Sequence, residues 1–597
     1  MKLILVSIFA ILFFVNLSCS IDQRKFGPWF PATEGEPWPV PWKRIMGNNS
    51  LILRPLSFKI ETTNTDCSIL QDAIERYKSI IFEEAKSAAH LLHGMEKHNS
   101  SFSGIMTGML IQKLNSCESQ PYFQMDESYS LEITDISDVA ILRANTVWGA
   151  LRGLETFTQL LSPSGIGASL KLTSQQINDK PRMPHRGLLL DTSRHFIPVD
   201  DIFLILDALS YNKLNVFHWH IVDDNSFPYE SNVFPKLSLK GSYHPTMVYS
   251  AYNIRKVIEY ARIRGIRVIP EFDTPAHTTS WGQGHPELLT QCYDKNGNLD
   301  GSTGPMDPTK PVLYTFLRSL LEEVVRLFPD KYLHVGGDEV PFECWESNPD
   351  ILTFMRDHNI TKNFTALENI FINRLLNITY DLNIKPIVWQ EVFDNGVKIH
   401  PGTVVQVWTG TWQSEVSSVT NAGFPVILST CWYLDHVAGG GDWRKYYLCD
   451  PLSFTGSIDQ KKLMMGGEAC MWAEFVDSPR FSVTSAQGVI DEEEMIQLTV
   501  NFISNRTGDF ETKLHLKYES GEMLCLDLQG SAVNCDICLE RCCLQMEDTY
   551  FTMSRSKLLA VHNRSDHIVK FRWLQYNDSE ENEIRQESVE PERQSIL

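Results

Sequence analysis

The sequence is poor in positive charge, and beyond Val15 it has no long apolar run. Lys and Arg total 53 against 74 Asp and Glu residues, which gives a formal charge of -21 at pH 7. That deficit argues against nucleic acid or anionic lipid as a partner held by the overall field. No segment beyond Val15 reaches the roughly eighteen apolar residues of a membrane span, so no span is expected. A glycine-rich nucleotide-binding pattern is also missing, and neither a cofactor nor a metal is expected.

The remaining composition is that of a globular protein. The 597 residues are 43% hydrophobic and 21% charged, which is enough chain for about three or four domains. At the N-terminus, MKLILVSIFAILFFVNLSCS places Lys2 before an apolar run, and small residues follow near Cys19 and Ser20. This order predicts a signal peptide at residues 1–20 and a protein of the secretory pathway.

A lumenal location permits disulfides and glycans. Among 13 cysteines, Cys67 with Cys117 and Cys292 with Cys344 are predicted bridges, although spacing alone does not fix the pairing. Cys470 is predicted to be a buried thiol in a core strand. Glycan acceptors are predicted at the N-x-S/T positions Asn48, Asn99, Asn359, Asn363, Asn377, Asn505, Asn563 and Asn577.

Two patterns divide the chain after the signal peptide. Residues 21–180 mix helical stretches, such as SILQDAIERYKSIIFEEAK, with alternating strands such as YSLEITD, and they predict a small α+β domain. In residues 181–479, apolar strands alternate with amphipathic helices, from GLLLD at Gly187 to LMMGGEACMW. Eight strand candidates joined by helices predict parallel βαβ units, for which a (β/α)8 barrel is the natural closed arrangement.

Polar and aromatic residues gather where the predicted strands end. Active sites of such barrels lie at the carboxyl ends of the strands, and ordinary loop residues would not favour these positions so consistently. The sequence therefore predicts a functional face. Its residues are Asp191, Arg194, Asp223, Asp224, Glu271, Asp273, His277, Asp338, Glu339, Trp389, Trp408, Tyr433, Asp435, Trp472 and Glu474.

The stretch KYLHVGGDEVPFECW at 331–345 combines a buried strand with two adjacent acids. Gly336 and Gly337 lead from the strand to Asp338 and Glu339. A solvated turn is one interpretation, because Gly-Gly-Asp is ordinary turn chemistry. The other is an active-site rim, where one carboxyl group is kept protonated and its neighbour is kept ionised.

Carboxylates and tryptophans on one rim suggest a sugar-binding site. Trp389, Trp408 and Trp472 can offer apolar ring faces to a pyranose, while Arg194, Asp223 and Glu474 can hold its hydroxyl groups. A single tryptophan is more often a core residue than a ligand contact. Three of them directly after barrel strands favour the ligand interpretation.

These motifs carry a resemblance to a known family. The chain from Ile21 to about residue 478 resembles the lysosomal β-N-acetylhexosaminidases of glycoside hydrolase family 20, with Ala276 where the family usually has glycine. The quoted motifs are DTSRH, HWHIVDD, EFDTPAH, HVGGDEV, IVWQEVFD, QVW, WYLD and GGEACMW.

The resemblance implies a substrate-assisted mechanism. Glu339 would protonate the leaving oxygen and later activate water, while Asp338 would orient the 2-acetamido group that attacks the anomeric carbon. Tyr433 would bond the acetamide carbonyl inside the three tryptophans, and Arg194 with Glu474 would fix the outer hydroxyls. Asp223 and His277 would support the acid pair.

The resemblance also implies a substrate class. Asp435-His436 stands where the subunit type that accepts sulfated sugars has Asn-Arg, so the chain resembles the β type, which acts on neutral terminal GlcNAc and GalNAc. It further implies a lysosomal location and a homo- or hetero-dimer.

The resemblance stops near Arg480. The segment from Phe481 alternates apolar and polar residues between turn signals, which predicts an immunoglobulin-like β-sandwich at 480–597, and it resembles repeats of hydin-type axonemal proteins. The stretch CDICLERCC, which contains Cys535, Cys538, Cys542 and Cys543, lacks separated ligand pairs and a histidine, so a zinc site is not expected.

This junction predicts a fusion in which the barrel lacks its last helix. The exposed flank of the first and eighth strands would cost on the order of ten kcal/mol, so weak or absent turnover is expected. A catalytically silent carbohydrate-binding or interaction protein is therefore one alternative. Hydrolysis by two separated carboxylates, indifferent to the acetamide, is another.

Overall fold

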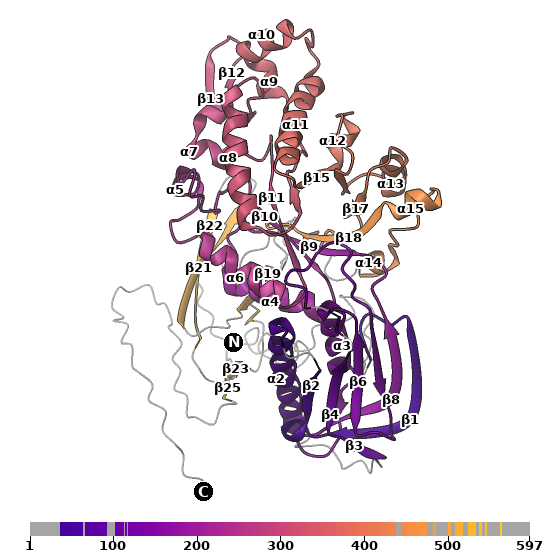
Figure 1. Cartoon of the computed structure of the whole chain (residues 1–597). Helices are drawn as coiled ribbons and strands as arrows, with labels where there is room; N and C mark the ends of the chain where they lie inside the picture. The colour runs from indigo at the N-terminus through magenta and orange to yellow at the C-terminus, as the bar shows by residue number, and fades with distance from the viewer. Residues whose placement is uncertain are drawn as a thin grey trace, which may run out of the picture. The chain divides into compact units, whose positions relative to one another are not determined.

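In the computed structural model, the described residues are 36–474, except for 64–65, 92–101, 113, 116 and 437–442, together with short strands between 481 and 563. Phe26–Glu474 forms one compact unit, and the strands after Phe475 belong to a second (Figure 1). The predicted signal peptide lies outside the described residues. Among the described residues, no helix combines the length and the apolarity that crossing a membrane requires.

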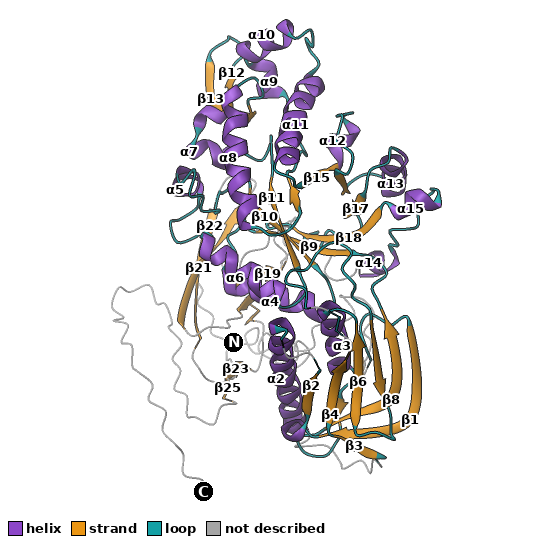
Figure 2. Ribbon diagram, in the orientation of Figure 1, coloured by secondary structure: helices purple, strands orange, loops and turns teal. Residues whose placement is uncertain are grey.

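The first part of the larger unit is a sheet with two helices against one face (Figure 2). The strands lie in the order β2-β4-β6-β5-β8-β1-β3, with β7 paired to β8. The side chains of β5 and β6 alternate between buried and half-buried, as in a sheet with one covered face. Its elements are β1 (Lys43–Leu53), β2 (Lys59–Thr62), α2 (Ser68–Leu91), β3 (Gly104–Met106), β4 (Gly108–Gln112), β5 (Tyr129–Ile133), β6 (Val139–Ala144), α3 (Val147–Gln159), β7 (Ser162–Pro163) and β8 (Leu170–Asp179).

The second part is a closed parallel barrel, as the sequence predicts. The strand order is β10-β11-β14-β15-β16-β17-β18-β9, and pairing of Gly466–Met471 with His185–Leu190 closes it. The strands are β9 (His185–Asp191), β10 (Val216–Val222), β11 (Arg267–Phe272), β14 (Tyr332–His334), β15 (Lys385–Trp389), β16 (Val404–Val407), β17 (Val426–Leu428) and β18 (Met464–Met471).

Helices connect these strands and cover the outside of the barrel, as Figure 2 shows for α8 and α11. Every residue of β10, β11 and β16 is buried, because such strands face the barrel interior on one side and helices on the other. The helices are α4 (Val199–Tyr211), α5 (Lys236–Gly241), α6 (Ala251–Arg262), α7 (Thr279–Gly284), α8 (Pro311–Leu327), α9 (Glu343–Ser347), α10 (Pro349–Asp357), α11 (Phe364–Asp381), α12 (Gln390–Asp394), α13 (Trp412–Asn421), α14 (Trp443–Leu448) and α15 (Ile458–Lys462).

The barrel interior has an apolar layer at its amino-terminal end and polar layers above it. The apolar layer consists of Val216, Ile269, Tyr332, Ile387, Val404, Ile427 and Met465. Two residues further along three of these strands, on the same inward face, lie His218, Glu271 and His334, all buried. Their charges and hydrogen bonds therefore lie directly beneath the carboxyl ends of the strands.

The closing strands are less covered than the others. Leu188 on β9 and Met471 on β18 are half-buried, in contrast to the fully buried β10. Within the described residues, no helix follows β18. The barrel nevertheless closes through the backbone pairing of β9 with β18.

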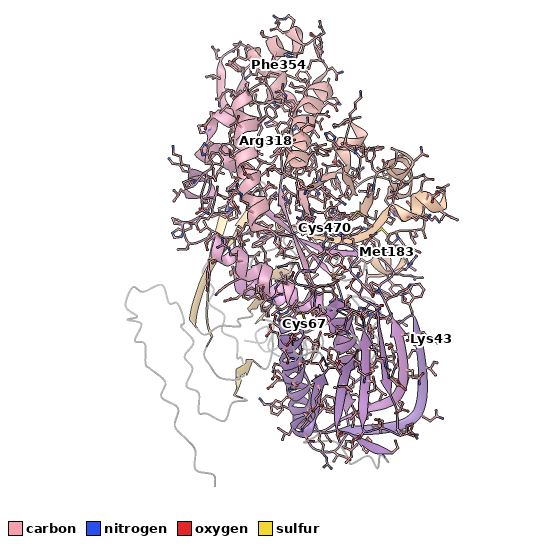
Figure 3. All side chains as sticks on the ribbon, in the orientation of Figure 1. Lys43, Cys67, Met183, Arg318, Phe354 and Cys470 are labelled. Atoms are coloured by element: carbon pink, nitrogen blue, oxygen red, sulfur yellow. A yellow bond between two sulfur atoms is a disulfide. The ribbon has the colours of Figure 1, made fainter. Side chains whose placement is uncertain are left out.

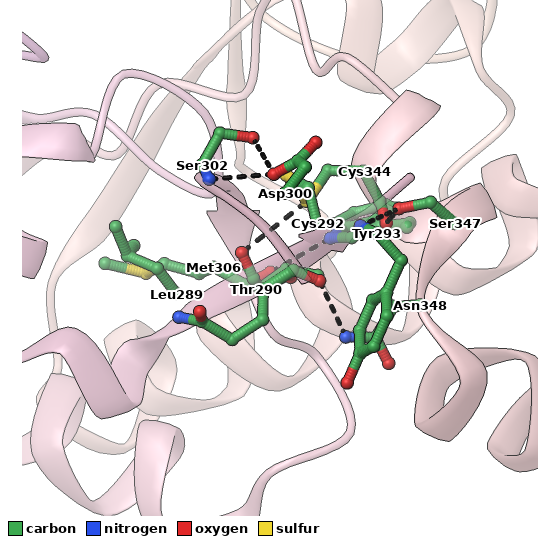
Figure 4. The surroundings of a disulfide bond; sticks show 12 residues. Leu289, Thr290, Cys292, Tyr293, Asp300, Ser302, Met306, Cys344, Ser347 and Asn348 are labelled. Atoms are coloured by element: carbon green, nitrogen blue, oxygen red, sulfur yellow. Dashed lines mark hydrogen bonds between the residues drawn. A yellow bond between two sulfur atoms is a disulfide. The ribbon is translucent and has the colours of Figure 1, made fainter. Parts of the chain in front are cut away.

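Three disulfides join described cysteines. Cys67–Cys117 and Cys292–Cys344 confirm the two predicted bridges, and Cys431–Cys449 is a third that was not predicted from the sequence. Figure 4 shows Cys292–Cys344 tying the hairpin of β12 (Leu289–Tyr293) and β13 (Leu299–Met306) to α9. Cys470 is a buried free thiol, as predicted, and Figure 3 places it within the barrel.

In the residues that are described, the second unit contains antiparallel strands of 2 to 10 residues. They are β19 (Phe481–Thr484), β20 (Thr499–Phe502), β21 (Gly508–Lys517), β22 (Met523–Ala532), β23 (Ile537–Leu539), β24 (Leu544–Gln545) and β25 (Val561–Asn563). They pair as β19-β20-β24, β21-β22 and β23-β25. The immunoglobulin-like sandwich stays a prediction, and most of CDICLERCC lies outside the described residues.

Candidate active site

The two adjacent acids lie at the carboxyl end of β14, where the chain makes an unusual turn. Gly336 and Gly337 have φ values of 74° and 103°, and Glu339 itself has a φ of 50°. A Cβ atom on Gly336 would overlap Asp273, and one on Gly337 would overlap Val392. The pair of glycines is therefore required both by conformation and by space.

The turn gives the two acids different surroundings. The side chain of Asp338 is 12% exposed, whereas that of Glu339 is 59% exposed. His277, in the loop that follows β11, places its Nε2 atom 3.7 Å from a carboxylate oxygen of each acid. Nδ1 of the same ring lies 3.4 Å from Oδ1 of Asp223. One imidazole therefore connects the acid pair to a buried carboxylate.

Arg194 forms ion pairs with acids that stand at the ends of neighbouring strands. Its Nη2 lies 2.9 Å from Asp223 and 3.9 Å from Glu474, and its Nη1 lies 3.3 Å from Asp191. The guanidinium also lies over the ring of Trp472, 5.1 Å from its centroid. Asp223 is buried behind this cluster, whereas Glu474 is 45% exposed. Glu474 is consequently accessible to a ligand, and Asp223 acts through its neighbours.

The three predicted tryptophans come together as one aromatic floor. Trp389 packs between Trp408 and Trp472, with ring centroids at 6.4 and 5.9 Å, and Trp408 lies 6.0 Å from the ring of Tyr433. Trp389 is only 1% exposed, so its ring lies beneath the other two. Trp408 and Trp472 are the half-buried members.

Tyr433 is held at the floor by backbone pairing with β18. It forms a bridge with Cys470, and the Leu434 amide donates to the Cys470 carbonyl at 2.8 Å. The Cys431–Cys449 disulfide starts two residues before Tyr433. Asp435 follows, half-buried, and burial together with the Glu474 carboxylate raises the pKa of Asp435.

Three acids of this site were not assigned a role from the sequence. Glu391, in α12, accepts a hydrogen bond from Trp408 Nε1 at 2.8 Å, and Glu271 accepts one from Trp389 Nε1 at 2.8 Å. Asp273 accepts from the Gly337 amide at 3.1 Å, which fixes the turn before the acid pair. Glu391 stands within the quoted IVWQEVFD motif, and Glu271 and Asp273 stand within EFDTPAH. Only the fold shows which groups they contact.

Burial and close charges shift the pKa values of several groups here. Burial and the Asp338 carboxylate raise the pKa of Asp273 well above its ordinary value. Burial also raises the pKa of Glu391 to about 7, although the hydrogen bond from Trp408 opposes the shift. Burial alone would raise the pKa of Asp223, but hydrogen bonds with His220 and His277 hold it far below its usual range. The site thus places neutral and ionised carboxyl groups side by side.

Three groups of described side chains bring possible metal ligands within 4.8 Å of one another. They are His218, Glu271 and His334; Asp223, Asp224 and His277; and Asp273, His277 and Asp338. Members of each group already make the ion pairs or hydrogen bonds described for the acid pair and the barrel interior. The expectation that the protein holds no metal stays a prediction.

A (β/α)8 barrel with adjacent carboxylates and an aromatic floor at its carboxyl-terminal face is typical of the glycoside hydrolases. Comparison with known families agrees. The model described as "Glycosyl hydrolase family 20, catalytic domain" matches residues 183–484, and "beta-acetyl hexosaminidase like" matches residues 37–160.

Similar proteins point to the same family. Human beta-hexosaminidase subunit beta is 46% identical over 482 residues, which are 80% of this chain and 85% of the human one. Bovine beta-hexosaminidase subunit alpha is 46% identical over 452 residues, covering 73% and 84%. A chitobiase of Flavobacterium johnsoniae has a TM-score of 0.63 at 28% identity, covering 74% of this chain and 66% of that one. The chain belongs to glycosyl hydrolase family 20.

Proposed function

We propose that the protein is an exo-acting, retaining β-N-acetylhexosaminidase that removes terminal GlcNAc or GalNAc from glycoconjugates by substrate-assisted catalysis. The observation that carries this proposal is the pair Asp338 and Glu339, one acid shielded and one open, both 3.7 Å from His277 Nε2. The human and bovine relatives, both named beta-hexosaminidase subunits, support it.

Glu339 is the proposed acid and base. In the first step, the carbonyl oxygen of the sugar's own 2-acetamido group attacks the anomeric carbon as the glycosidic bond breaks, and Glu339 gives its proton to the leaving oxygen. In the second step, water attacks the same carbon, Glu339 takes a proton from it, and the oxazolinium ring reopens to the acetamide. Two inversions give net retention, and no enzyme nucleophile is needed.

Asp338 is the proposed partner of the acetamide nitrogen. Its carboxylate would accept the N–H hydrogen bond and face the positive charge that develops on the oxazolinium ring. Shielding from solvent, at 12% exposure of the side chain, makes that interaction stronger than it would be in water. Trp408, Trp472 and Tyr433 would enclose the acetamide, with Trp389 as the base of the floor.

Arg194 and Glu474 are the proposed contacts to the outer hydroxyls. Asp223 fixes the Arg194 guanidinium at 2.9 Å, so the guanidinium can present its remaining N–H groups in one orientation. The carboxylate of Asp435 would disfavour a 6-sulfate, which makes neutral terminal sugars the preferred substrates.

We also propose passage through the secretory pathway to the lysosome, and assembly as a homo- or hetero-dimer. The similar proteins named as alpha and beta subunits support the assembly proposal. The four sequon asparagines whose side chains are described, Asn48, Asn359, Asn363 and Asn377, are all exposed, as glycosylation requires.

The test is hydrolysis of a chromogenic β-GlcNAc glycoside beside the matching β-glucoside. Turnover of the acetamido sugar alone, abolished by Glu339→Gln, is the expected result. Equal use of the glucoside would instead favour two separated carboxylates. Because Leu188 and Met471 are only half-buried on the closing strands, we expect the turnover to be low, and robust turnover would contradict that expectation.

A silent carbohydrate-binding protein is the second candidate, and the half-buried closing strands favour it. It predicts binding of terminal GlcNAc with no hydrolysis by the chain as it stands. Equilibrium dialysis with GlcNAc beside the turnover assay separates the two candidates.

A further inference from the structure

Buried acids and imidazoles alternate through the barrel interior and end at the acid pair. The order is His185, Glu468, His218, Glu271, His220, Asp223 and His277. From His185 to Asp223 all side chains are at most 2% exposed, and they come from β9, β18, β10 and β11, with Asp223 directly after β10. The mechanism proposed above uses only the last two members.

The half of this series of residues that lies nearest the site is connected by an unbroken run of hydrogen bonds. Nδ1 of His220 lies 2.6 Å from Glu271 Oε2, and Nε2 of the same ring lies 2.8 Å from Asp223 Oδ2. Asp223 turns its other oxygen to His277 Nδ1 at 3.4 Å. His220 can donate to both carboxylates only when both of its ring nitrogens carry a proton.

The deeper half repeats the alternation of acids and imidazoles, but its link between His218 Nε2 and Glu271 is a close charge contact without hydrogen-bond geometry. His218 Nδ1 lies 2.6 Å from Glu468 Oε1, and His218 Nε2 lies 3.1 Å from Glu271 Oε2. The other oxygen of Glu468 lies 2.7 Å from His185 Nε2. Gln406 adds a neutral donor to Glu468 at 2.8 Å.

The protonation states of the histidines in this series follow from these contacts. Burial opposes the charge of His218, but Glu468 and Glu271 raise its pKa to about 9. Burial likewise opposes the charge of His220, but Glu271 and Asp223 raise its pKa well above the ordinary value. Burial lowers the pKa of His185, which favours the neutral imidazole at the deep end. The ionised members therefore alternate in sign along the chain.

His277 is the last residue in this alternating series of acids and imidazoles. Burial opposes its charge, but the carboxylates of Asp273, Asp223 and Asp338 raise its pKa to about 11. A protonated His277 has a hydrogen on each ring nitrogen, one for Asp223 and one for the acid pair. Its orientation depends on Asp223, and the orientation of Asp223 depends on His220 and Arg194.

We infer that Glu271 and His220 are positioning residues for the acid–base cycle of Glu339: the alternating chain holds Asp223, and through it His277, in the one orientation that faces both catalytic acids. This inference rests on the proposed function. Glu271 serves the substrate pocket as well, because its second oxygen accepts the Trp389 N–H at 2.8 Å.

Other charged or titratable groups face these members. His334, from β14, lies 2.9 Å from Glu271, and burial lowers its pKa. Arg194 shares Asp223 with His220, and Asp191 faces Arg194. Asp273 and the thiol of Cys470 are two further titratable groups close to Glu271, and burial raises the pKa of each.

Glu271→Gln is the direct test, because it removes the negative charge that faces His220 while keeping the size of the side chain. His220 then keeps only Asp223 as an anionic partner and releases its proton at a lower pH. At pH 4.5 it stays protonated, so kcat should fall by less than about 3-fold. At pH 7 it is deprotonated, His277 loses its orientation, and kcat should fall by about 30-fold.

Glu368→Gln is the matched control. Glu368 is another buried barrel acid, in α11, and its hydrogen-bond partner is the amide of Asn395. Its kcat–pH profile should parallel that of the parent. Two results would overturn the inference. One is a fall in kcat of Glu271→Gln that is the same at every pH, and the other is an equal pH-dependent fall in kcat of Glu368→Gln.

A second measurement does not depend on turnover. With 15N-labelled histidine, three imidazoles of the parent should stay doubly protonated to pH 8, and Glu271→Gln should bring at least one of them into the range of pH 5–8. If the variant does not fold, the measurement on the parent alone tests the inference. Titration of every histidine below pH 7 would contradict the inference. The expected doubly protonated imidazoles in a protein without any turnover would contradict the proposed function instead.

Discussion

The carboxylate of Glu391 accepts a hydrogen bond from Nε1 of Trp408 at 2.8 Å. The contact fixes the half-buried ring of Trp408 in the aromatic floor. The orientation of Trp408 therefore depends on an acid of the short helix α12.

Removing this acceptor should loosen the floor. Glu391→Ala leaves the indole N–H of Trp408 unpaired, and we expect KM for a chromogenic GlcNAc glycoside to rise about 10-fold. Glu391→Gln keeps an acceptor oxygen and should leave KM within about 2-fold of the parent. Steady-state kinetics of the two variants side by side provide the check, and equal KM values would contradict this role.

Three buried acids should make the folded chain more stable at acidic pH. Burial raises the pKa of Glu155, Glu368 and Glu391 to about 7 each. Above a pKa of about 4.3 the unfolded chain ionises these groups while the folded one keeps their protons, so their stabilisation is full below that pH and is lost as pH rises through 7. Calorimetry should give a higher Tm at pH 5 than at pH 7.5.

The paired variant isolates one of these acids. Glu368→Gln cannot ionise, so the drop in stability between pH 5 and 7.5 should shrink by on the order of 1–3 kcal/mol. An unchanged pH dependence in this variant, or a Tm that rises toward pH 7.5 in the parent, would count against the assignment.

Asp435 should set the response to sulfated sugars. Asp435→Asn removes the negative charge, and we expect kcat/KM for a 6-sulfated GlcNAc glycoside, relative to the neutral one, to rise about 10-fold. Asp435→Glu keeps the charge and serves as the control. Because burial raises the pKa of Asp435, discrimination by the parent should weaken as the pH falls. A ratio that is the same in all three proteins would exclude the role.

The disulfide Cys431–Cys449, which was not predicted from the sequence, should support the site. Cys431–Cys449 closes a span of 18 residues that contains Tyr433 and Asp435. Replacing both cysteines with serine should cost about 3 kcal/mol of unfolding free energy and raise KM. The matched change at Cys67–Cys117, in the small domain, should lower stability while leaving KM unchanged. Denaturant titration with parallel kinetics tests both expectations.

The sequence predicted the barrel and the grouping of the site residues because both follow from simple repeats. Eight apolar strands alternating with helices permit few closed arrangements, and the strand ends then meet at one face. The strand order of the small domain could not be found in this way, because β1 pairs with β3 across some fifty residues of intervening chain.

Side-chain partners inside the barrel were beyond sequence reasoning for a different reason. HWHIVDD predicts a strand, but alternation alone does not say that His218 and His220 face inward toward Glu271 of β11 and Glu468 of β18. Glu271 stands 51 residues from His220, and Glu468 stands 250 residues from His218. Only closure of the barrel brings them within hydrogen-bond distance.

The central claim, that the acetamide of the sugar is the nucleophile and Asp338 its partner, is tested most directly by binding of a GlcNAc-thiazoline, a stable mimic of the oxazolinium ring. Calorimetric titration should show tight binding by the parent and by Glu339→Gln, with affinity at least about 100-fold weaker in Asp338→Asn. Equal affinity of all three proteins for the thiazoline would contradict the account.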